Sequence, residues 1–423
     1  MVREEILQAL LRVEAGENTL EEVLNRKMKN KQDQGLYREI LKGIYRHLIT
    51  IDYFIHSFLK KKNQKLHLPI QMILRMSFYQ WMYLDKIPAH AIVYEGVELA
   101  KKVGHRGSVG FVNAILRKAT AQKLDPEALH FNSLEEEIHI KYSLPVEWTR
   151  YFIKNYGEDW TLDFAKNSVK IPDLHLRVNT NKISSQDLKN SLKKEGINLV
   201  DLKGGCQGLE VLEGNIFETE EFKQGLFYVQ DKAAMMVAEF SLEKEEMLER
   251  VLDVCGAPGG KSIGMSFLNP DLEIFCCDVT KEKVDKIKEN LHRLDLNQVK
   301  ALKRDGRHLS PEERNKFDLV LLDAPCSGLG LLRRKPEIKY NRTLKDMKSL
   351  VKLQRQLLDT SSQCVKLGGK LVYSTCTLSK EENEMMMEDF LIHHKDFDLL
   401  DQKVLNLNEE TDGFKMFKLV KKC

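Results

Sequence analysis

Two cysteines in this 423-residue chain stand just after apolar runs that are typical of buried β-strands. Cys326 belongs to FDLVLLDAPCSGLG (317–330), and Cys376 follows GKLVYST (369–375). Turn-forming and hydroxyl residues surround both cysteines, which favours positions at strand ends. If the two strands lie side by side in one sheet, both thiols reach the same edge of that sheet. The two thiols are therefore the first candidates for chemistry.

Two neighbouring thiols suit the transfer of a methyl group to carbon 5 of a pyrimidine. That carbon is too weak a nucleophile to attack a sulfonium methyl group unaided, but a thiolate that adds to carbon 6 makes it enamine-like. A base must then remove the proton on carbon 5 so that the thiolate can leave, and the second thiol is a candidate for this step. The residues alone do not assign the two steps to the two cysteines.

A glycine-rich loop and two acidic residues indicate a cofactor that contains adenosine. The loop DVCGAPGGK (253–261) follows one predicted strand and precedes a helix, where backbone N–H groups can face a ligand. Asp278 and Asp305 stand at the ends of the next two predicted strands, where a doubly wound fold brings acids to a nucleoside. Cys255 stands where a phosphate loop requires glycine, so a nucleoside triphosphatase is only a minor alternative.

These segments need a framework, and the sequence predicts a multidomain chain. Residues 1–130 are expected to form an all-α domain, because segments such as 71–84 and 91–103 are amphipathic with a helical period. Residues 138–242 combine short strand-like and helical segments, which predicts a small α+β middle domain. From 243 to 423 strands alternate with helices, so we expect an α/β Rossmann-like domain with a parallel, doubly wound sheet.

The composition excludes several classes of protein. With 42% hydrophobic and 30% charged residues the chain is typical of a globular protein rather than a disordered one. No signal peptide and no membrane span are expected, so we expect a cytosolic protein. The eight cysteines lack Cys-x-x-Cys spacing, which favours reduced thiols and argues against a metal site. Four of them are expected to be core residues: Cys206, Cys276, Cys277 and Cys364.

The distribution of charge indicates a polyanionic partner. The net charge is only +3, but residues 1–130 carry 21 Lys and Arg against 14 Asp and Glu. A second basic region follows Cys326, between residues 331 and 355. From Arg342 to Arg355 its basic residues recur every three or four positions, which places them along one face of a predicted helix. Two basic regions in a nearly neutral chain are typical of a nucleic-acid-binding protein.

Taken together, the motifs resemble a known family. In chain order, DVCGAPGGK, the acids Asp278 and Asp305, DAPCSGLG, RRKPEIKY (333–340) and YSTCT look like the RNA cytosine-5 methyltransferases that use S-adenosylmethionine. The segment AIVYEGVELAKKVGHRGSVGFVNAILRK (91–118) resembles the NusB-type RNA-binding domain of the RsmB/Sun (Fmu) branch, and DGFKMFKLVKK (412–422) resembles the closing segment of that branch. The resemblance spans nearly the whole chain and implies a class I methyltransferase that modifies small-subunit (16S) ribosomal RNA.

The resemblance also implies roles for individual residues. Cys376 is expected to attack the base and Cys326 to assist the release of product. Asp323 is expected to line the site shared by cofactor and base, and to favour cytosine because its amino group is a donor. Asp278 is expected to hold the ribose and Asp305 to lie near the adenine. The methionine part is expected to be wrapped by Cys255, Gly256, Ala257, Pro258, Gly259, Gly260 and Lys261. The family usually has alanine where this chain has Gly256, and we expect the missing methyl group to matter little.

The RNA is expected to approach along the basic residues that follow Cys326. A target base must leave its stack to reach buried thiols, so we expect a single-stranded or flipped nucleotide. Weaker candidates for the same groove are Arg177, Gln230, Asp231 and Lys232. The residues expected to contact phosphates are Arg333, Arg334, Lys335, Arg342, Lys345, Lys348, Lys352 and Arg355.

Two alternatives to this interpretation stay open. One is a transfer-RNA cytosine-5 methyltransferase, and the other is a non-catalytic RNA-binding protein of the antitermination type. The presence of both cysteines and of all three strand-end acids argues against a decayed enzyme, and the helical N-terminal region favours ribosomal RNA. An amino-group methyltransferase is disfavoured because DAPC stands where such enzymes have Asn/Asp-Pro-Pro-aromatic. We expect a monomer that acts on naked RNA or on an early assembly intermediate.

Overall fold

The computed structural model describes residues 2–28, 30–61, 64–204, 206–242, 248–308, 310–408 and 410–422. The chain divides into two units. The helical unit consists of Met1–Lys170 and Leu332–Asn341, and the α/β unit consists of Ile171–Leu331 and Arg342–Cys423. Within the described ranges no helix is both long enough and apolar enough to cross a membrane.

The described part of the helical unit contains helices and no strand, as predicted for the N-terminal region. The helices expected at 71–84 and 91–103 are present as α5 and α6, and Pro69 lies in the first turn of α5, where its missing N–H costs nothing. One apolar core joins α1, α3, α5 and α7. The helices are α1 (Val2–Glu14), α2 (Leu20–Leu24), α3 (Gln34–Arg46), α4 (Leu48–Ser57), α5 (Leu68–Tyr83), α6 (Ala89–Val103), α7 (Arg106–Thr120), α8 (Leu134–Lys141), α9 (Val146–Tyr156), α10 (Glu158–Ser168) and α16 (Ile338–Asn341).

The short segment Leu332–Asn341 belongs to the helical unit although it is distant from the rest of that unit in the chain. The guanidinium of Arg46 donates to the main-chain oxygen of Arg333 over 3.1 Å. The amine of Lys339 donates to the main-chain oxygens of Tyr142 over 3.2 Å and Arg46 over 3.4 Å, and burial lowers the pKa of Lys339 to about 7. The chain therefore leaves the α/β unit six residues after Cys326 and returns to it at residue 342.

The α/β unit begins with a small antiparallel sheet in the order β2-β3-β1-β4, which agrees with the mixture of short strands and helices expected in this region. Ser184 caps α11 by accepting the Asp187 N–H, and Leu176, Leu188 and Phe227 form part of the core beneath the sheet. The elements are β1 (Leu174–Val178), α11 (Ser185–Lys194), β2 (Asn198–Asp201), β3 (Leu209–Glu213), α12 (Glu220–Lys223), β4 (Phe227–Val229) and α13 (Lys232–Ser241).

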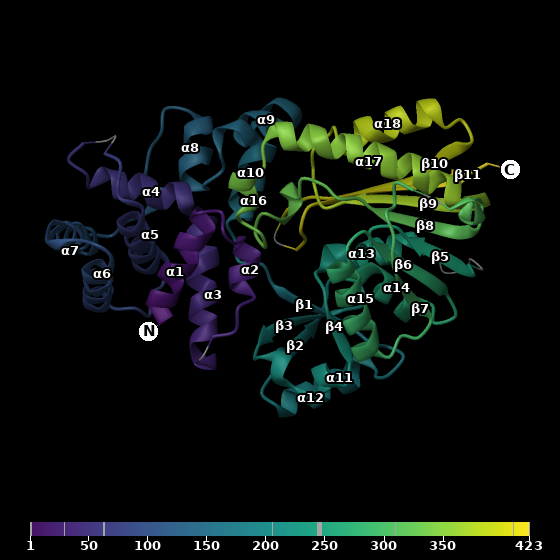
Figure 1. Cartoon of the computed structure of the whole chain (residues 1–423), viewed down its shortest axis with the longest axis horizontal. Coiled ribbons are helices and arrows are strands. Elements are labelled where there is room, and N and C mark those ends of the chain that lie inside the picture. Colours follow the sequence, from purple (N-terminus) through teal and green to yellow (C-terminus); the bar gives the residue numbers. More distant parts are fainter. Residues whose placement is uncertain are drawn as a thin grey trace. The chain divides into compact units, whose positions relative to one another are not determined.

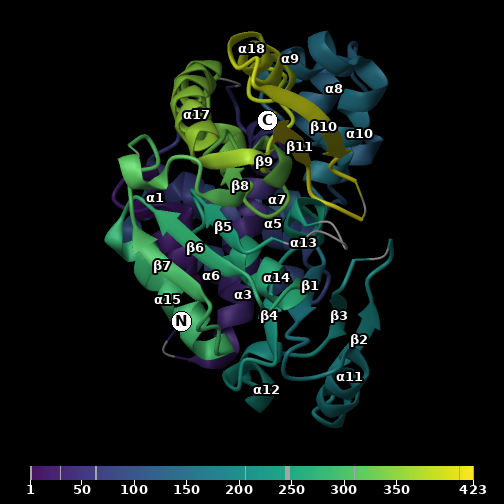
Figure 2. The same ribbon diagram turned by 90° about the vertical axis from the view of Figure 1, so that its right-hand side faces the viewer.

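A seven-stranded sheet in the order β10-β11-β9-β8-β5-β6-β7 forms the centre of the α/β unit. The five strands from β9 to β7 are parallel, as expected. Figure 2 shows how the strands twist progressively across the sheet. The strands are β5 (Arg250–Asp253), β6 (Glu273–Asp278), β7 (Val299–Lys303), β8 (Phe317–Asp323), β9 (Val365–Thr375), β10 (Phe397–Leu405) and β11 (Phe414–Lys421).

The expectation of a wholly parallel sheet is wrong at one edge. β11 pairs antiparallel with both β9 and β10. The reason is the short connection of residues 406–413, since a parallel pair needs a crossover of a dozen or more residues whereas an antiparallel pair does not. The sheet is therefore mixed.

Helices cover both faces of the large sheet (Figure 1). α17 and α18 lie on one face, and α13, α14 and α15 lie on the other. The buried strand β8 alternates between the two cores: Leu319 and Leu321 pack with α14 and α15, and Val320 and Leu322 pack with α17 and α18. The helices of the large sheet are α14 (Gly260–Leu268), α15 (Lys281–Leu294), α17 (Leu344–Cys364) and α18 (Glu384–His393).

Candidate functional site

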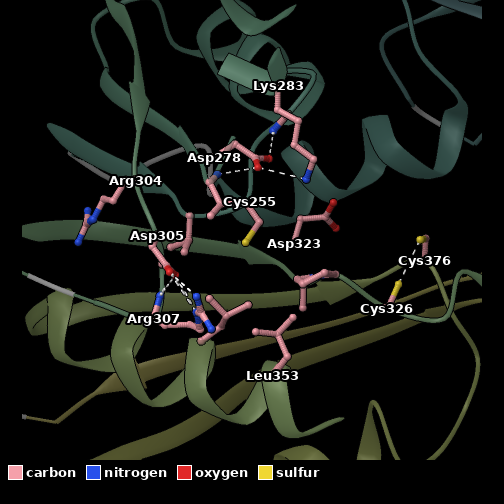
Figure 3. A pocket seen from close by; sticks show the side chains of 17 residues that line it. Cys255, Asp278, Lys283, Arg304, Asp305, Arg307, Asp323, Cys326, Leu353 and Cys376 are labelled. Atoms are coloured by element: carbon pink, nitrogen blue, oxygen red, sulfur yellow. Dashed lines mark hydrogen bonds and ion pairs between the residues drawn. The ribbon is translucent and has the colours of Figure 1, made fainter. Parts of the chain in front are cut away.

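The two cysteines selected from the sequence meet at the carboxyl edge of the large sheet. β8 and β9 pair in parallel with Asp323 opposite Ser374, so the loops that follow the two strands start from the same edge. The Sγ atoms of Cys326 and Cys376 lie 3.2 Å apart (Figure 3). The prediction that these strands lie side by side and bring both thiols together is confirmed.

A cavity of about 530 Å³ opens beside the thiols, at the ends of β5, β6, β7 and β8. Its lining includes Asp278, Asp305, Asp323 and both cysteines, so the residues singled out by the sequence surround one space. Figure 3 shows Asp278 and Asp305 toward one end, the two sulfur atoms at the other and Asp323 between them. All of these residues belong to the α/β unit.

The glycine-rich loop contributes to the cavity through three of its residues, Val254, Cys255 and Ala257. A Cβ atom at Gly256 would lie 2.4 Å from the Cys276 sulfur and 2.8 Å from a carboxylate oxygen of Asp253. The space that an alanine methyl group would occupy at this position is therefore already filled by these two side chains. Gly259 has a φ of +104°, a conformation that glycine adopts without strain and that begins α14.

The two acids at the cofactor end are already held by neighbouring groups. Asp278 accepts the N–H of Val279 over 2.7 Å and of Ala257 over 3.3 Å, and it pairs with Lys283 over 3.1 Å. Asp305 binds the guanidinium and the N–H of Arg307, and these hydrogen bonds lower the pKa of Asp305 to about 2. Both carboxyl groups are thus fixed in orientation at successive strand ends, as the sequence predicted.

Asp323 forms an ion pair that the sequence did not indicate. Its carboxylate accepts from the Lys261 amine over 2.6 Å and from the Ser374 hydroxyl over 2.7 Å. Burial disfavours the charged amine of Lys261, but the Asp323 carboxylate outweighs burial and raises the pKa of Lys261. Lys261 was expected only as part of the cofactor loop, and no periodicity links it to a residue 62 positions away.

The surroundings of Cys326 oppose its ionisation. The pKa of Cys326 lies well above its ordinary value, first because of its hydrogen bond with Cys376 and then because it is buried. The negative charges of Glu382 and Asp323 add to this shift. With its pKa raised in this way, Cys326 is a protonated thiol at neutral pH.

The four other cysteines considered in the sequence are core residues, as predicted. Their exposed fractions are all 6% or less. Cys277 packs into the core that faces α17, and Cys276 lies in the opposite core, behind the glycine-rich loop. The residues are Cys206, Cys276, Cys277 and Cys364.

The basic residues expected to contact RNA fall into two groups. The predicted stripe is exposed, although Arg355 pairs with Asp389 over 2.9 Å. It consists of Arg342, which lies just before α17, and of four residues on α17: Lys345, Lys348, Lys352 and Arg355. In the helical unit, Arg333 is only 2% exposed and Lys335 pairs with Glu21 over 2.9 Å, while Arg334 is half-buried. Burial removes Arg333 from the surface that RNA could touch, because the segment that carries it packs among the N-terminal helices.

Three of the four weaker candidates of the middle region are also buried, and Asp231 is half-buried. The Arg177 side chain is 2% exposed and donates to the main-chain oxygens of Met235 over 2.7 Å and Gly264 over 3.2 Å. It links the small sheet to α13 and α14. Asp231 caps α13 by accepting the Ala234 N–H. Gln230 and Lys232 are 8% and 5% exposed. None of these side chains is placed as a surface phosphate contact would be.

Several residues of the site were missed from the sequence. Lys283 lies one turn into α15, where its amine reaches Asp278, and Arg304 and Arg307 flank Asp305. Leu353 and Leu357 of α17 form an apolar wall of the cavity. Their i, i+4 spacing on an amphipathic helix gave a usable signal for a buried face, but nothing in the sequence distinguished a cavity wall from ordinary core.

Comparisons with known proteins agree with this arrangement. The family described as 16S rRNA methyltransferase RsmB/F matches residues 240–420, the NusB family matches residues 1–121, and the RsmF/B-like ferredoxin-like domain matches residues 144–215. A probable ribosomal RNA small subunit methyltransferase B of Bacillus subtilis (strain 168) is 33% identical over 407 residues, which cover 94% of this chain and 89% of that protein.

Solved structures show the same likeness. A methyltransferase homolog protein from Pyrococcus horikoshii is 28% identical with a TM-score of 0.61, and the match covers 70% of this chain and 100% of that one. NSun6 from Pyrococcus horikoshii, solved with SFG, is 25% identical with a TM-score of 0.59, and the match covers 66% of this chain and 98% of that one. With a relative that is 33% identical along nearly its whole length, the chain belongs to the RsmB/F family of 16S rRNA methyltransferases.

Proposed function

We propose that this enzyme transfers a methyl group to carbon 5 of a cytosine in small-subunit (16S) ribosomal RNA, through a covalent bond between Cys376 and the base. The observation that carries the proposal is the 3.2 Å separation of the Cys326 and Cys376 sulfur atoms at the wall of the cavity. Methylation of a carbon that is a weak nucleophile requires such an activating group, whereas methylation of an amino group or a hydroxyl does not.

The methyl donor of the family, S-adenosylmethionine, fits the residues around the cavity. Asp278, at the end of β6, can accept the ribose hydroxyls while the N–H groups of Ala257 and Val279 and the amine of Lys283 hold its carboxylate in place. Asp305 lies at the end of the next strand, on the side expected for the adenine. We assign the methionine part to the loop of residues 255–261, whose packing at Gly256 leaves no room for a side chain.

The roles of the two thiols are assigned from the resemblance of their motifs to the RNA cytosine-5 methyltransferases. The Cys376 thiolate forms a bond to carbon 6 of the cytosine, and the electron density this places on carbon 5 attacks the methyl group that S-adenosylmethionine supplies. Cys326 then releases its own proton to solvent and, as a thiolate, accepts the carbon-5 proton; the bond from Cys376 to carbon 6 breaks, its electron pair returns to the Cys376 sulfur, and the aromatic ring is restored. Once Cys376 is bound to carbon, it no longer offers its sulfur charge to Cys326, so the largest cause of the raised Cys326 pKa disappears when a base is needed.

Asp323 is the residue we assign to recognition of the base. It lies between the cofactor end and the thiols, and its partners Lys261 and Ser374 fix its carboxylate. A carboxylate accepts from the cytosine amino group but not from the oxygen that replaces it in uracil. The base has to leave its stack to reach this position, as in other enzymes that act on a nucleobase.

The remainder of the chain is assigned to binding the RNA. We propose that the domain within residues 1–130 binds ribosomal RNA, that the region 138–242 connects it to the catalytic domain within 243–423, and that the exposed stripe on α17 contacts phosphates. We further propose that the enzyme is a cytosolic monomer that acts on naked RNA or an early assembly intermediate. A reducing cytosol suits a mechanism that needs two free thiols.

A tritium-release assay tests the site of methylation. Small-subunit ribosomal RNA transcribed with [5-³H]cytidine is incubated with the enzyme and S-adenosylmethionine, and tritium in the solvent is compared with methyl groups in the RNA. Methylation at carbon 5 releases one tritium for each methyl group added. Methylated RNA without released tritium would overturn the proposal in favour of an amino or hydroxyl acceptor. RNA binding without either signal would favour the non-catalytic alternative, and release from transfer RNA alone would correct the substrate.

A further inference from the structure

A buried carboxylate lies behind the two thiols and has no role in the mechanism so far. Glu382 follows the Cys376 loop in the chain, and its exposed fraction is 0%. One carboxylate oxygen accepts the Ser327 N–H over 2.8 Å and the Gln354 amide over 2.9 Å. The other accepts the hydroxyls of Ser327 and Ser379, each over 2.5 Å. A carboxylate is acceptor-only when ionised, and this one meets four donors.

Three of these four donors come from the loops that carry the two cysteines. Ser327 is the residue after Cys326, and its hydroxyl also contacts the hydroxyl of Thr377, the residue after Cys376, over 2.8 Å. Ser379 lies two positions further along the Cys376 loop. The Glu382 carboxylate therefore bridges two loops that follow neighbouring strands, at the residues immediately beside the reactive sulfur atoms.

The bridge is braced by the elements around it. The Gln354 amide, from α17, donates to the main-chain oxygen of Pro325 over 3.0 Å as well as to Glu382. The Tyr373 hydroxyl, from β9, donates to the main-chain oxygen of Glu382 over 2.8 Å. The neighbouring residue Asn383 accepts the Thr375 hydroxyl over 2.7 Å and donates to the Ser379 main-chain oxygen over 2.7 Å. Contacts with Glu382 and Asn383 thus fix the backbone on both sides of Cys376.

We propose that Glu382 is a positioning residue that keeps the Cys326 and Cys376 loops at one separation, so that Cys326 can act on the adduct formed by Cys376. Without the carboxylate, four buried donors lose their acceptor, and the loops must rearrange to find others. The proposal rests on the proposed function only in assigning the second step to Cys326. The separation of the two sulfur atoms can be tested on the enzyme alone, before RNA or cofactor is added.

The rate at which the two thiols form a disulfide measures their separation directly. Diamide accepts two electrons and two protons from the Cys326 and Cys376 thiols and becomes the hydrazine, and mass spectrometry counts the linked peptides. We expect Glu382→Ala to form the disulfide about 100-fold more slowly than wild type. A rate loss of this size is typical when two reacting groups are displaced by about 1 Å. Glu382→Gln is expected to stay within a few-fold of wild type, because its amide can donate to the two serine hydroxyls while its oxygen accepts from Ser327 and Gln354.

Two further variants keep the result interpretable. Ser327→Ala removes the hydroxyl that joins Glu382 to Thr377 and leaves the carboxylate in place, so it reports on the bridge even if Glu382→Ala does not fold. We expect its closure rate to lie between those of wild type and Glu382→Ala. As a control, Glu388→Ala removes an exposed carboxylate of α18 and should form the disulfide at the wild-type rate. Equal closure rates in wild type, Ser327→Ala and folded Glu382→Ala would overturn the proposal.

A second readout separates this inference from the proposed function. With RNA and S-adenosylmethionine, a displaced Cys326 should leave the Cys376 adduct unreleased, so Glu382→Ala should accumulate a protein–RNA band on a denaturing gel as Cys326→Ala does. If the substitution only reduced the fraction of folded protein, all activity would fall in proportion to that fraction and no such band would accumulate. If Cys326→Ala itself traps no RNA, the two-thiol mechanism fails, and the disulfide rates still decide whether Glu382 positions the loops.

Discussion

The sulfur atoms of Cys326 and Cys376 lie 3.2 Å apart although the two residues are 50 positions apart in the chain. At this distance a negative charge on one sulfur opposes ionisation of the other, and the pKa of Cys326 is raised mainly by its hydrogen bond with Cys376. The raised pKa keeps the Cys326 thiol protonated at neutral pH. In the mechanism we propose, Cys376 attacks the base first and Cys326 acts only afterwards.

Removal of Cys376 should make Cys326 more reactive toward alkylation. In the Cys376→Ala variant the largest cause of the raised Cys326 pKa is absent, so its thiolate forms at lower pH. Alkylation by iodoacetamide between pH 7 and 10, followed by peptide mass spectrometry, should show the Cys326 profile shifted to lower pH than in wild type. An unchanged profile would mean that burial alone sets the ionisation of Cys326. Buried Cys364 serves as an internal control, because its surroundings do not change.

Replacement of Gly256 by alanine should destabilise the α/β unit. The added Cβ atom would lie 2.4 Å from the Cys276 sulfur, which must move, and overpacking of this kind costs about 1–3 kcal/mol. The double variant Gly256→Ala/Cys276→Ala should be less destabilised than the two single variants predict together. Urea unfolding followed by fluorescence measures the four free energies of the cycle. Strictly additive effects would show that the two residues do not share this space.

Asp253 should make stability depend on pH in an unusual direction. Its carboxyl group is fully buried, and burial raises its pKa to about 7, so folding takes up a proton between pH 4 and 7. The stabilising contribution is complete below pH 4 and is lost as the pH rises to 7. Relative to wild type, Asp253→Asn should therefore gain stability with rising pH across this window, by up to about 4 kcal/mol. Unfolding free energies of both proteins from pH 4 to 8 test this, and a difference that is constant with pH would contradict it.

The exposed lysines of α17 should account for part of the salt dependence of RNA binding. Lys348→Ala/Lys352→Ala removes two of the charges on the predicted stripe without touching the cavity. If both contact phosphates, the slope of log K against log salt should become shallower by about 1.4–1.8. The matched control Lys193→Ala/Lys194→Ala removes two charges from α11 and should leave the slope unchanged. Equal effects of the two pairs would mean that the stripe on α17 is an ordinary solvated face.

Much of the site was predictable because parallel strands deliver their carboxyl ends to one edge. The positions of Asp278, Asp305 and Asp323 at strand ends, and of Cys326 and Cys376 just beyond them, can be read from apolar runs and the turn residues that follow. Their meeting in one cavity follows from the topology. The antiparallel partner β11 was not predicted, since the strand pattern alone does not distinguish a crossover from a hairpin.

What the sequence did not indicate depends on contacts between distant segments. Arg333 looked like part of a basic surface, but the segment that carries it is packed among helices more than 150 residues earlier in the chain. The pairing of Lys261 with Asp323, and the bridge that Glu382 makes between two loops, join residues whose spacing has no period. Charge and exposure can be estimated residue by residue, whereas partners of buried polar groups require the fold.

The most direct test of the central claim is a search for the covalent protein–RNA adduct. Wild type, Cys376→Ala and Cys326→Ala are incubated with small-subunit ribosomal RNA and radiolabelled S-adenosylmethionine and run on a denaturing protein gel. The two-thiol mechanism predicts a labelled protein–RNA band that persists only in Cys326→Ala, because Cys376 can still attack the base but release is blocked. Methylation by Cys376→Ala, with no trapped RNA in either variant, would contradict it.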